Sequence, residues 1–61
     1  MARYRLYHLQ GHQLAAADEL EAADDAEAAS LARERARFDV TEVWRGDRRI
    51  RTILPPAAPR G

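Results

Sequence analysis

The sequence contains no cysteine and no lysine, and the absence of cysteine excludes several kinds of site. Without cysteine the chain has neither a disulfide framework nor a cysteine-based zinc site. No apolar run approaches the roughly 18 residues that a membrane-spanning helix needs. The three glycines form no phosphate-binding loop, and the only serine, Ser30, falls inside a predicted helix. We therefore predict a protein that is not an enzyme, with no catalytic residue, no metal and no cofactor.

The chain of 61 residues has room for one small domain only. A core of this size barely outweighs the entropy that is lost when the chain is ordered. We therefore expect the protein to assemble with itself or with a larger protein. The N-terminal residues alternate between polar and apolar types and lack the apolar core of a signal peptide, which favours a cytoplasmic protein.

Ten arginines balance ten acidic residues, but the two signs are separated along the chain. Residues 1–30 hold two arginines and six acidic residues, a net charge of −4, whereas residues 31–61 hold eight arginines and four acidic residues, a net charge of +4. The zero total argues against a protein that coats nucleic acid or an anionic membrane with its whole surface. The separation itself has two readings, a binding face or complementation of a helix dipole.

The first half of the chain predicts a hairpin followed by a helix. Residues 3–9 are rich in tyrosine and leucine and predict a strand, Gly11 allows a turn, and residues 13–21 predict a returning strand. Asp24 is a favourable N-cap, and Glu27 lies at the spacing of a capping box. The alanine, leucine, glutamate and arginine that follow predict a helix to about residue 37, with small residues along one face.

The second half predicts another hairpin. Residues 38–45 and 48–54 contain valine, isoleucine, threonine and tryptophan, and Gly46-Asp47 between them is a two-residue turn with glycine first. Pro55-Pro56 cannot continue a strand ladder. The fold class is therefore α+β, a single small domain with the order β-β-α-β-β, two antiparallel hairpins and one helix packed on one sheet face. We place this domain at residues 1–54 and a Pro-rich tail at residues 55–61.

One helix covers only one face of a four-stranded sheet, whereas the predicted strands hold more apolar side chains than one face needs. Several of these side chains must lie on the uncovered face, although alternation alone leaves open which face the helix covers. The candidate residues for contact with another protein are Tyr4, Tyr7, Trp44, Ile50 and Ile53.

Three segments carry a resemblance to a known group: Arg3-Tyr4-Arg5-Leu6-Tyr7, Asp24-Asp25-Ala26-Glu27-Ala28, and Glu42-Val43-Trp44-Arg45-Gly46-Asp47-Arg48. They resemble the tyrosine-rich strand, the helix start and the tryptophan-containing hairpin of short uncharacterised proteins from GC-rich alphaproteobacteria. The resemblance spans most of residues 3–54 and implies a compact α+β fold. It implies no activity and no site residues, because none are established for the group.

Two functional hypotheses follow from the residues. The first is a small non-catalytic protein-interaction module that acts as a homo-oligomer or as an accessory subunit of a larger assembly. The alternative is a small nucleic-acid-binding or regulatory protein, because arginine contacts phosphates and guanine edges while aromatic side chains stack on bases. The arginines of the second hairpin that would serve this alternative are Arg45, Arg48, Arg49 and Arg51.

Two histidines, His8 and His12, bracket the first turn. Together with Asp18 or Glu19 they have the ligand types that suit zinc or iron. Nothing in the sequence fixes such a geometry, and a histidine pair beside a turn is usually solvated. We therefore predict that both histidines lie on the surface.

Overall fold

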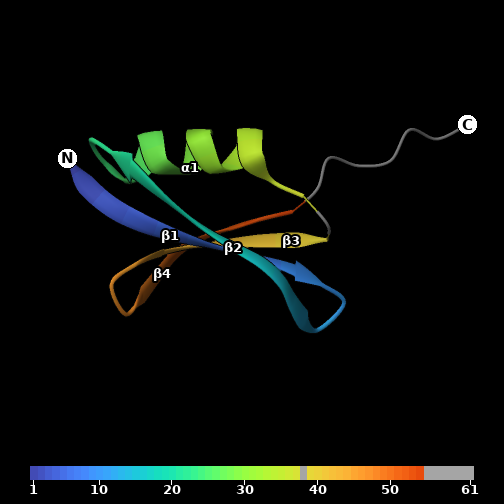
Figure 1. Cartoon of the computed structure of the whole chain (residues 1–61). Coiled ribbons are helices and arrows are strands. Elements are labelled where there is room, and N and C mark those ends of the chain that lie inside the picture. Colours follow the sequence, from blue (N-terminus) through green and yellow to red (C-terminus); the bar gives the residue numbers. More distant parts are fainter. Residues whose placement is uncertain (38, 55–61) are drawn as a thin grey trace, which may run out of the picture.

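The computed structural model describes residues 1–37 and 39–54. Within them, four strands and one helix follow in the order β-β-α-β-β (Figure 1). All neighbouring strands are antiparallel, and their order in the single sheet is β2-β1-β3-β4. This is the predicted α+β fold; the predicted tail lies outside the described residues. The elements are β1 (Ala2–Gln10), β2 (Gln13–Ala22), α1 (Asp25–Arg35), β3 (Val40–Arg45) and β4 (Arg48–Ile53).

The helix α1 begins at the predicted cap. The Glu27 backbone N–H donates to Asp24 Oδ1 at 2.8 Å, and Glu27 Oε1 in turn accepts from the backbone N–H of Ala23 at 2.6 Å, one residue before the N-cap. The helix ends at Arg35, slightly earlier than predicted, because Ala36 takes an extended conformation with ψ of 133°. Within the described ranges, no helix is long and apolar enough to cross a membrane.

The helix lies across one face of the sheet (Figure 1). Its buried residues are three alanines, Ala28, Ala29 and Ala32, so its backbone approaches the sheet closely. Most of the core between helix and sheet comes from alternate strand residues that face α1. The core cluster consists of Tyr4, Leu6, Leu20, Ala22, Ala28, Ala32, Val43 and Ile53.

Both hairpin turns contain a glycine with positive φ, 64° at Gly11 and 63° at Gly46, where a side chain would introduce strain. The first turn is also held from outside the hairpin. The Gly11 backbone N–H donates to Asp39 Oδ2 at 2.7 Å, and the Asp39 N–H donates to the Leu9 carbonyl at 3.0 Å. These contacts fix the path from α1 back to β3.

Candidate functional site: the open face of the sheet

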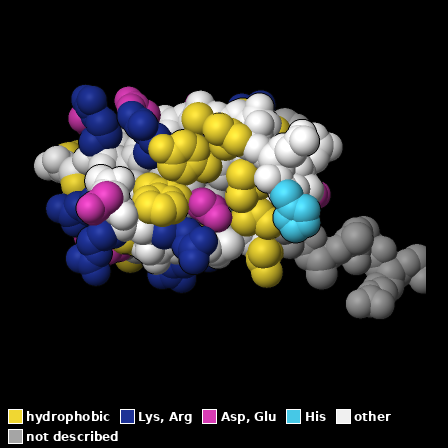
Figure 2. Space-filling view, turned by 90° about the horizontal axis from the view of Figure 1, so that it is seen from below, with side chains coloured by type: hydrophobic (Ala, Val, Ile, Leu, Met, Phe, Trp, Pro, Cys, Tyr) yellow, Lys and Arg dark blue, Asp and Glu magenta, His cyan; other side chains and the backbone are white. Residues whose placement is uncertain are grey.

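The sheet face opposite α1, called here the open face, carries an aromatic pair. Tyr7 on β1 and Trp44 on β3 lie with their ring centroids 6.2 Å apart and their planes at 84°, an edge-to-face arrangement that aromatic rings prefer. Leu9 and Leu14 extend this group, and Leu14 is 57% exposed. We call these four residues the apolar ridge. Figure 2 shows the open face, with hydrophobic side chains gathered over its middle and charged groups around them.

A shallow groove of about 460 Å³ runs along the apolar ridge and is also lined by Glu42 and Gly46. Glu42 supplies the one carboxylate of the groove lining, and this carboxylate accepts hydrogen bonds from two neighbouring side chains. Its Oε1 accepts from Trp44 Nε1 at 3.1 Å, and its Oε2 accepts from an Arg49 guanidinium nitrogen at 3.3 Å. The groove is therefore an apolar surface whose single acidic group already has partners.

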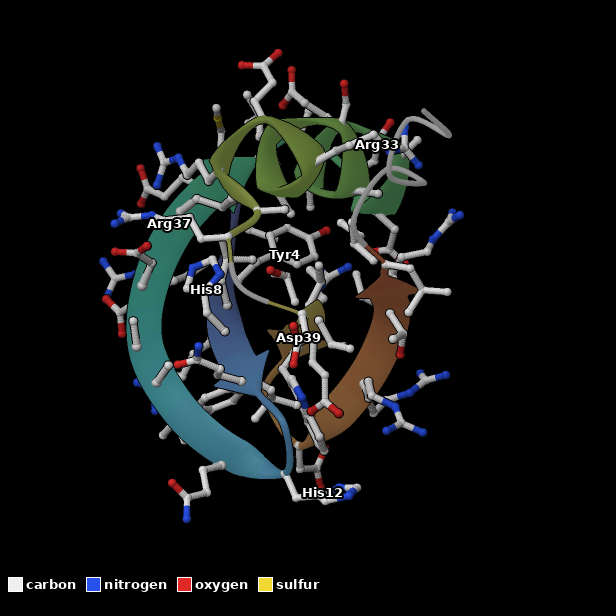
Figure 3. The ribbon with its side chains drawn as sticks, turned by 90° about the vertical axis from the view of Figure 1, so that its right-hand side faces the viewer. Tyr4, His8, His12, Arg33, Arg37 and Asp39 are labelled. Atoms are coloured by element: carbon white, nitrogen blue, oxygen red, sulfur yellow. The ribbon has the colours of Figure 1, made fainter. Side chains whose placement is uncertain are left out.

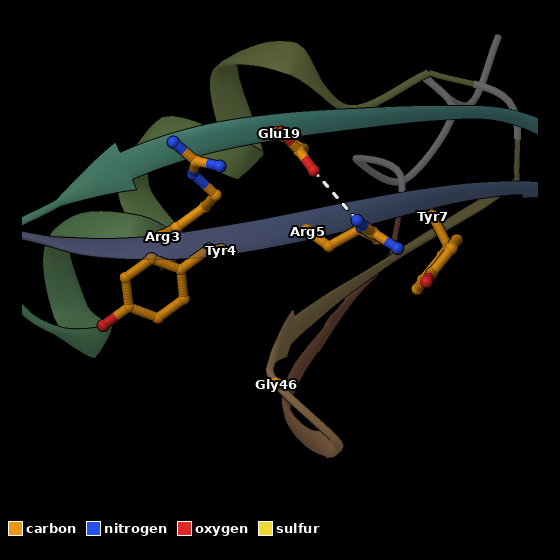
Figure 4. Close-up of a pocket in the computed structure, with 6 residues that line it drawn as sticks. All are labelled: Arg3, Tyr4, Arg5, Tyr7, Glu19 and Gly46. Atoms are coloured by element: carbon orange, nitrogen blue, oxygen red, sulfur yellow. Dashed lines mark hydrogen bonds and ion pairs between the residues drawn. The ribbon is translucent and has the colours of Figure 1, made fainter.

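The other charged side chains of the open face are also paired. Arg5 on β1 and Glu19 on β2 are 2.9 Å apart, and Arg3 and Glu21 on the same two strands are 3.9 Å apart. Hydrogen bonding to Tyr7 and to Glu19 raises the pKa of the Arg5 guanidinium above its ordinary value. Figure 4 shows this end of the open face, where Arg3, Arg5 and Glu19 line a hollow of about 350 Å³ beside the β3–β4 turn.

Tyr4, a predicted contact residue, lies instead on the covered face and has no exposed surface. Its hydroxyl donates to Asp25 Oδ1 at 2.7 Å, and the Arg45 guanidinium lies 5.7 Å from its ring centroid and 3.7 Å from Asp25. Burial, and next the hydrogen bond to Asp25, raise the pKa of the Tyr4 hydroxyl. Tyr4 thus joins the first turn of α1 to the sheet and is not available to a partner.

The two isoleucines among the predicted contact residues also belong to the covered face. Ile53 is 5% exposed within the core, and Ile50 is half-buried and packs against that core. In a regular strand Ile50 and Ile53, three residues apart, would lie on opposite faces. A bulge brings both to the covered face, because the β3–β4 register shifts between Val43 and Trp44. Of the predicted contact set, Tyr7 and Trp44 lie on the open face.

The arginines of the second hairpin do not form one cluster. Arg45 is held on the covered side by Tyr4, and Arg49 is held by Glu42 of the open face. Within the described residues, Arg48 and Arg51 make no ion pair. The predicted nucleic-acid group is therefore divided between the two sides of the sheet.

The prediction for His8 was wrong, because this side chain has no exposed surface. Its Nδ1 lies 2.9 Å from Thr41 Oγ1 and its Nε2 lies 3.2 Å from Asp18 Oδ2. His12, in contrast, is exposed at the tip of the first hairpin, well away from His8 (Figure 3). The two histidines therefore do not form a common site, and the described part of the chain holds no cluster of three metal-binding side chains.

The order Thr41–His8–Asp18 matches the hydroxyl, imidazole and carboxylate of nucleophilic catalysis. Neither Thr41 nor His8 has exposed surface, however, so a substrate has no route to the hydroxyl. The arrangement instead satisfies polar groups that the sheet buries beside the core, and in the described part of the chain no buried side-chain polar atom lacks a partner.

Comparison with known proteins adds no relative: no family model, no curated protein and no solved structure matches the chain.

Proposed function

We propose that this protein is a small non-catalytic interaction module that binds a partner protein on its open face. It would act in the bacterial cytoplasm, as an accessory subunit of a larger assembly or as a homo-oligomer. The observation that carries the proposal is the apolar ridge, which no described element covers and which lies on a sheet face whose charged groups are paired.

A protein partner suits this face for two physical reasons. Tyrosine and tryptophan are over-represented among the residues that dominate binding energy in protein interfaces, and Tyr7 and Trp44 make up half of the ridge. In addition, Arg3, Arg5 and Arg49 each have a glutamate within 4 Å, so a partner could cover them without leaving a lone buried charge.

The alternative, nucleic-acid binding, has one favourable observation: Tyr7 and Trp44 are partly exposed beside Arg5 and Arg49. It has less support, because both guanidinium groups already bind carboxylates and the zero net charge gives no long-range attraction to phosphate. Such binding would depend on Arg48 and Arg51, which lie on an outer strand.

Photo-crosslinking in the source bacterium tests the proposal. A photoreactive amino acid replaces Thr52, an exposed residue opposite Glu42, or Ser30 on the exposed side of α1. We expect nuclease-resistant adducts with another protein from position 52 but not from position 30, and we expect Trp44→Ala to remove them. Adducts between two copies of this chain are counted separately, because Thr52 lies on the outer strand β4. Equal adducts with other proteins from both positions, or such adducts that persist in a folded Trp44→Ala variant, would contradict the proposal.

Fluorescence anisotropy with labelled single-stranded DNA and RNA tests the alternative. At about 50 mM salt, where electrostatic attraction is strong, we expect no saturable binding by the wild-type protein. Saturable binding that is lost when Arg48 and Arg51 are changed to alanine would favour the alternative over the protein partner.

A further inference from the structure

The two outer strands of the sheet carry opposite charge. The acidic residues of β2 are Asp18, Glu19 and Glu21, and β2 contains no arginine; the basic residues of β4 are Arg48, Arg49 and Arg51, and β4 contains no acid. Because β2 and β4 end the order β2-β1-β3-β4, each has one side on which no strand of the described chain pairs with it. Figure 3 shows the two strands at opposite edges of the sheet.

Charge on an outer strand ordinarily prevents edge-to-edge pairing. In this protein, repulsion between like charges disfavours two of the three possible edge pairings between copies. Acid against acid disfavours β2 beside β2, and arginine against arginine disfavours β4 beside β4. The third pairing, β4 of one copy beside β2 of another, brings opposite charges together and is favoured.

We infer that copies of this protein associate head to tail, with β4 of one copy adding as an antiparallel strand to β2 of the next. Strand direction supports the inference. Neighbouring strands alternate in direction from β2 to β4, so a copy placed beside β2 with its helix on the same face presents β4 antiparallel to β2. The inference uses the sheet edges and does not rest on the proposed function of the open face.

For the three residues of β4 that follow the bulge, a register exists that matches charge and face. Asp18 lies opposite Leu6 and Arg51 lies opposite Val43, so both belong to the covered side of the sheet. Setting Arg51 opposite Asp18 of the next copy places their charges together. The same register sets Thr52 opposite Ala17 on the open side and Ile53 opposite Ala16 on the covered side.

The carboxylates that this pairing needs contact Arg3, Arg5 and His8 within the chain but remain partly exposed. Exposed fractions of the side chains are 39% for Asp18, 49% for Glu19 and 63% for Glu21. Arg48 and Arg51 are exposed and make no ion pair among the described residues. Because β4 has only six residues, the added ladder is short, and we expect association to grow over the micromolar to millimolar range.

Sedimentation velocity of the full chain tests the inference. We expect the average mass to rise with protein concentration at about 50 mM NaCl and to fall at about 500 mM, where the screening length drops to roughly 4 Å. The Arg48→Glu/Arg51→Glu variant is expected to weaken association about tenfold, because attraction between β4 and the acidic residues of β2 becomes repulsion. Arg33→Glu/Arg37→Glu makes the same change of net charge outside β2 and β4 and should retain more of the association.

Charge reversal also allows a rescue. The Glu19→Arg/Glu21→Arg variant should likewise associate more weakly. Mixing it with Arg48→Glu/Arg51→Glu should restore association, because β4 of the first variant and β2 of the second keep their native charges and can form the wild-type pair. Circular dichroism checks that each variant is folded. A wild-type protein that stays monomeric at low salt, or folded edge variants that associate as the wild type does, would overturn the inference. Association that survives both edge variants but is lost in Trp44→Ala would overturn it in favour of the open face.

Discussion

The two faces of the sheet are built from the same alternating strands but differ in what covers them. On the face under α1, Tyr4, Leu6 and Val43 have no exposed surface. On the open face, Tyr7 and Trp44 are only partly buried, although they come from the same strands. The difference shows that strand alternation divides the apolar side chains between two faces, while one helix completes a core on only one of them.

Removal of a large buried side chain from the covered face has the largest expected effect. Leu6→Ala should lower the free energy of unfolding by about 2–5 kcal/mol, because it deletes fully buried methyl groups and leaves a cavity. Urea unfolding followed by circular dichroism measures the loss. Leu9→Ala, on the same strand but on the open face, is the control and should cost much less. Equal losses would show that the two faces are equally buried.

Enlargement of the helix face that packs on the sheet has the next largest effect. Ala32 has no exposed surface, so Ala32→Leu should cost about 1–3 kcal/mol through overpacking. Ala26→Leu, on the exposed side of α1, should change stability by no more than about 0.5 kcal/mol. Thermal unfolding of both variants makes the comparison, and a tolerated Ala32→Leu would mean that α1 does not approach the sheet closely.

Loss of the helix cap has a smaller effect. Asp24→Ala removes the acceptor of the Glu27 backbone N–H and should cost about 0.5–2 kcal/mol in chemical unfolding. Asp24→Asn keeps an acceptor at the same place and should retain most of the stability. A loss that is the same for both variants would assign the effect to the charge of Asp24 and not to the cap.

The smallest effect is a pH dependence at the contact between α1 and the sheet. The raised pKa of Tyr4 means that the folded state favours the neutral phenol. The contribution of Tyr4 to the free energy of unfolding is therefore complete below the pKa of about 10 in the unfolded state, and it is lost as pH rises through the pKa in the folded state. Urea midpoints should therefore fall between about pH 9 and about pH 11, and less steeply in Tyr4→Phe. If the urea midpoint falls equally steeply with pH in the two proteins, ionisation of Tyr4 does not contribute to the pH dependence.

Local sequence patterns predicted the fold well. Alternation located the strands, Asp24 and Glu27 located the helix start, and the glycines at positions 11 and 46 located the turns. Each of these signals depends on residues close together in the chain, so each can be recognised without knowledge of the tertiary structure.

The site was only half predicted, because its remaining features depend on pairing between distant segments. The bulge beside Trp44 turns Ile50 toward the core, and strand spacing alone does not reveal it. Leu14 was missed because the alanines after it give a weak strand signal. His8 shares the alternation of Tyr4 and Leu6, which was a usable sign of burial, although its partners come from two other strands.

The central claim is that the open face receives a partner protein, and the crosslinking yield from position 52 tests it most directly. The yield should be compared in cells between the otherwise wild-type protein and a folded Tyr7→Ala/Trp44→Ala variant. Our account predicts nuclease-resistant adducts with another protein in the first and their loss in the second, while the yield of such adducts from position 30 stays low in both. Adducts of equal yield in the two proteins would contradict the claim.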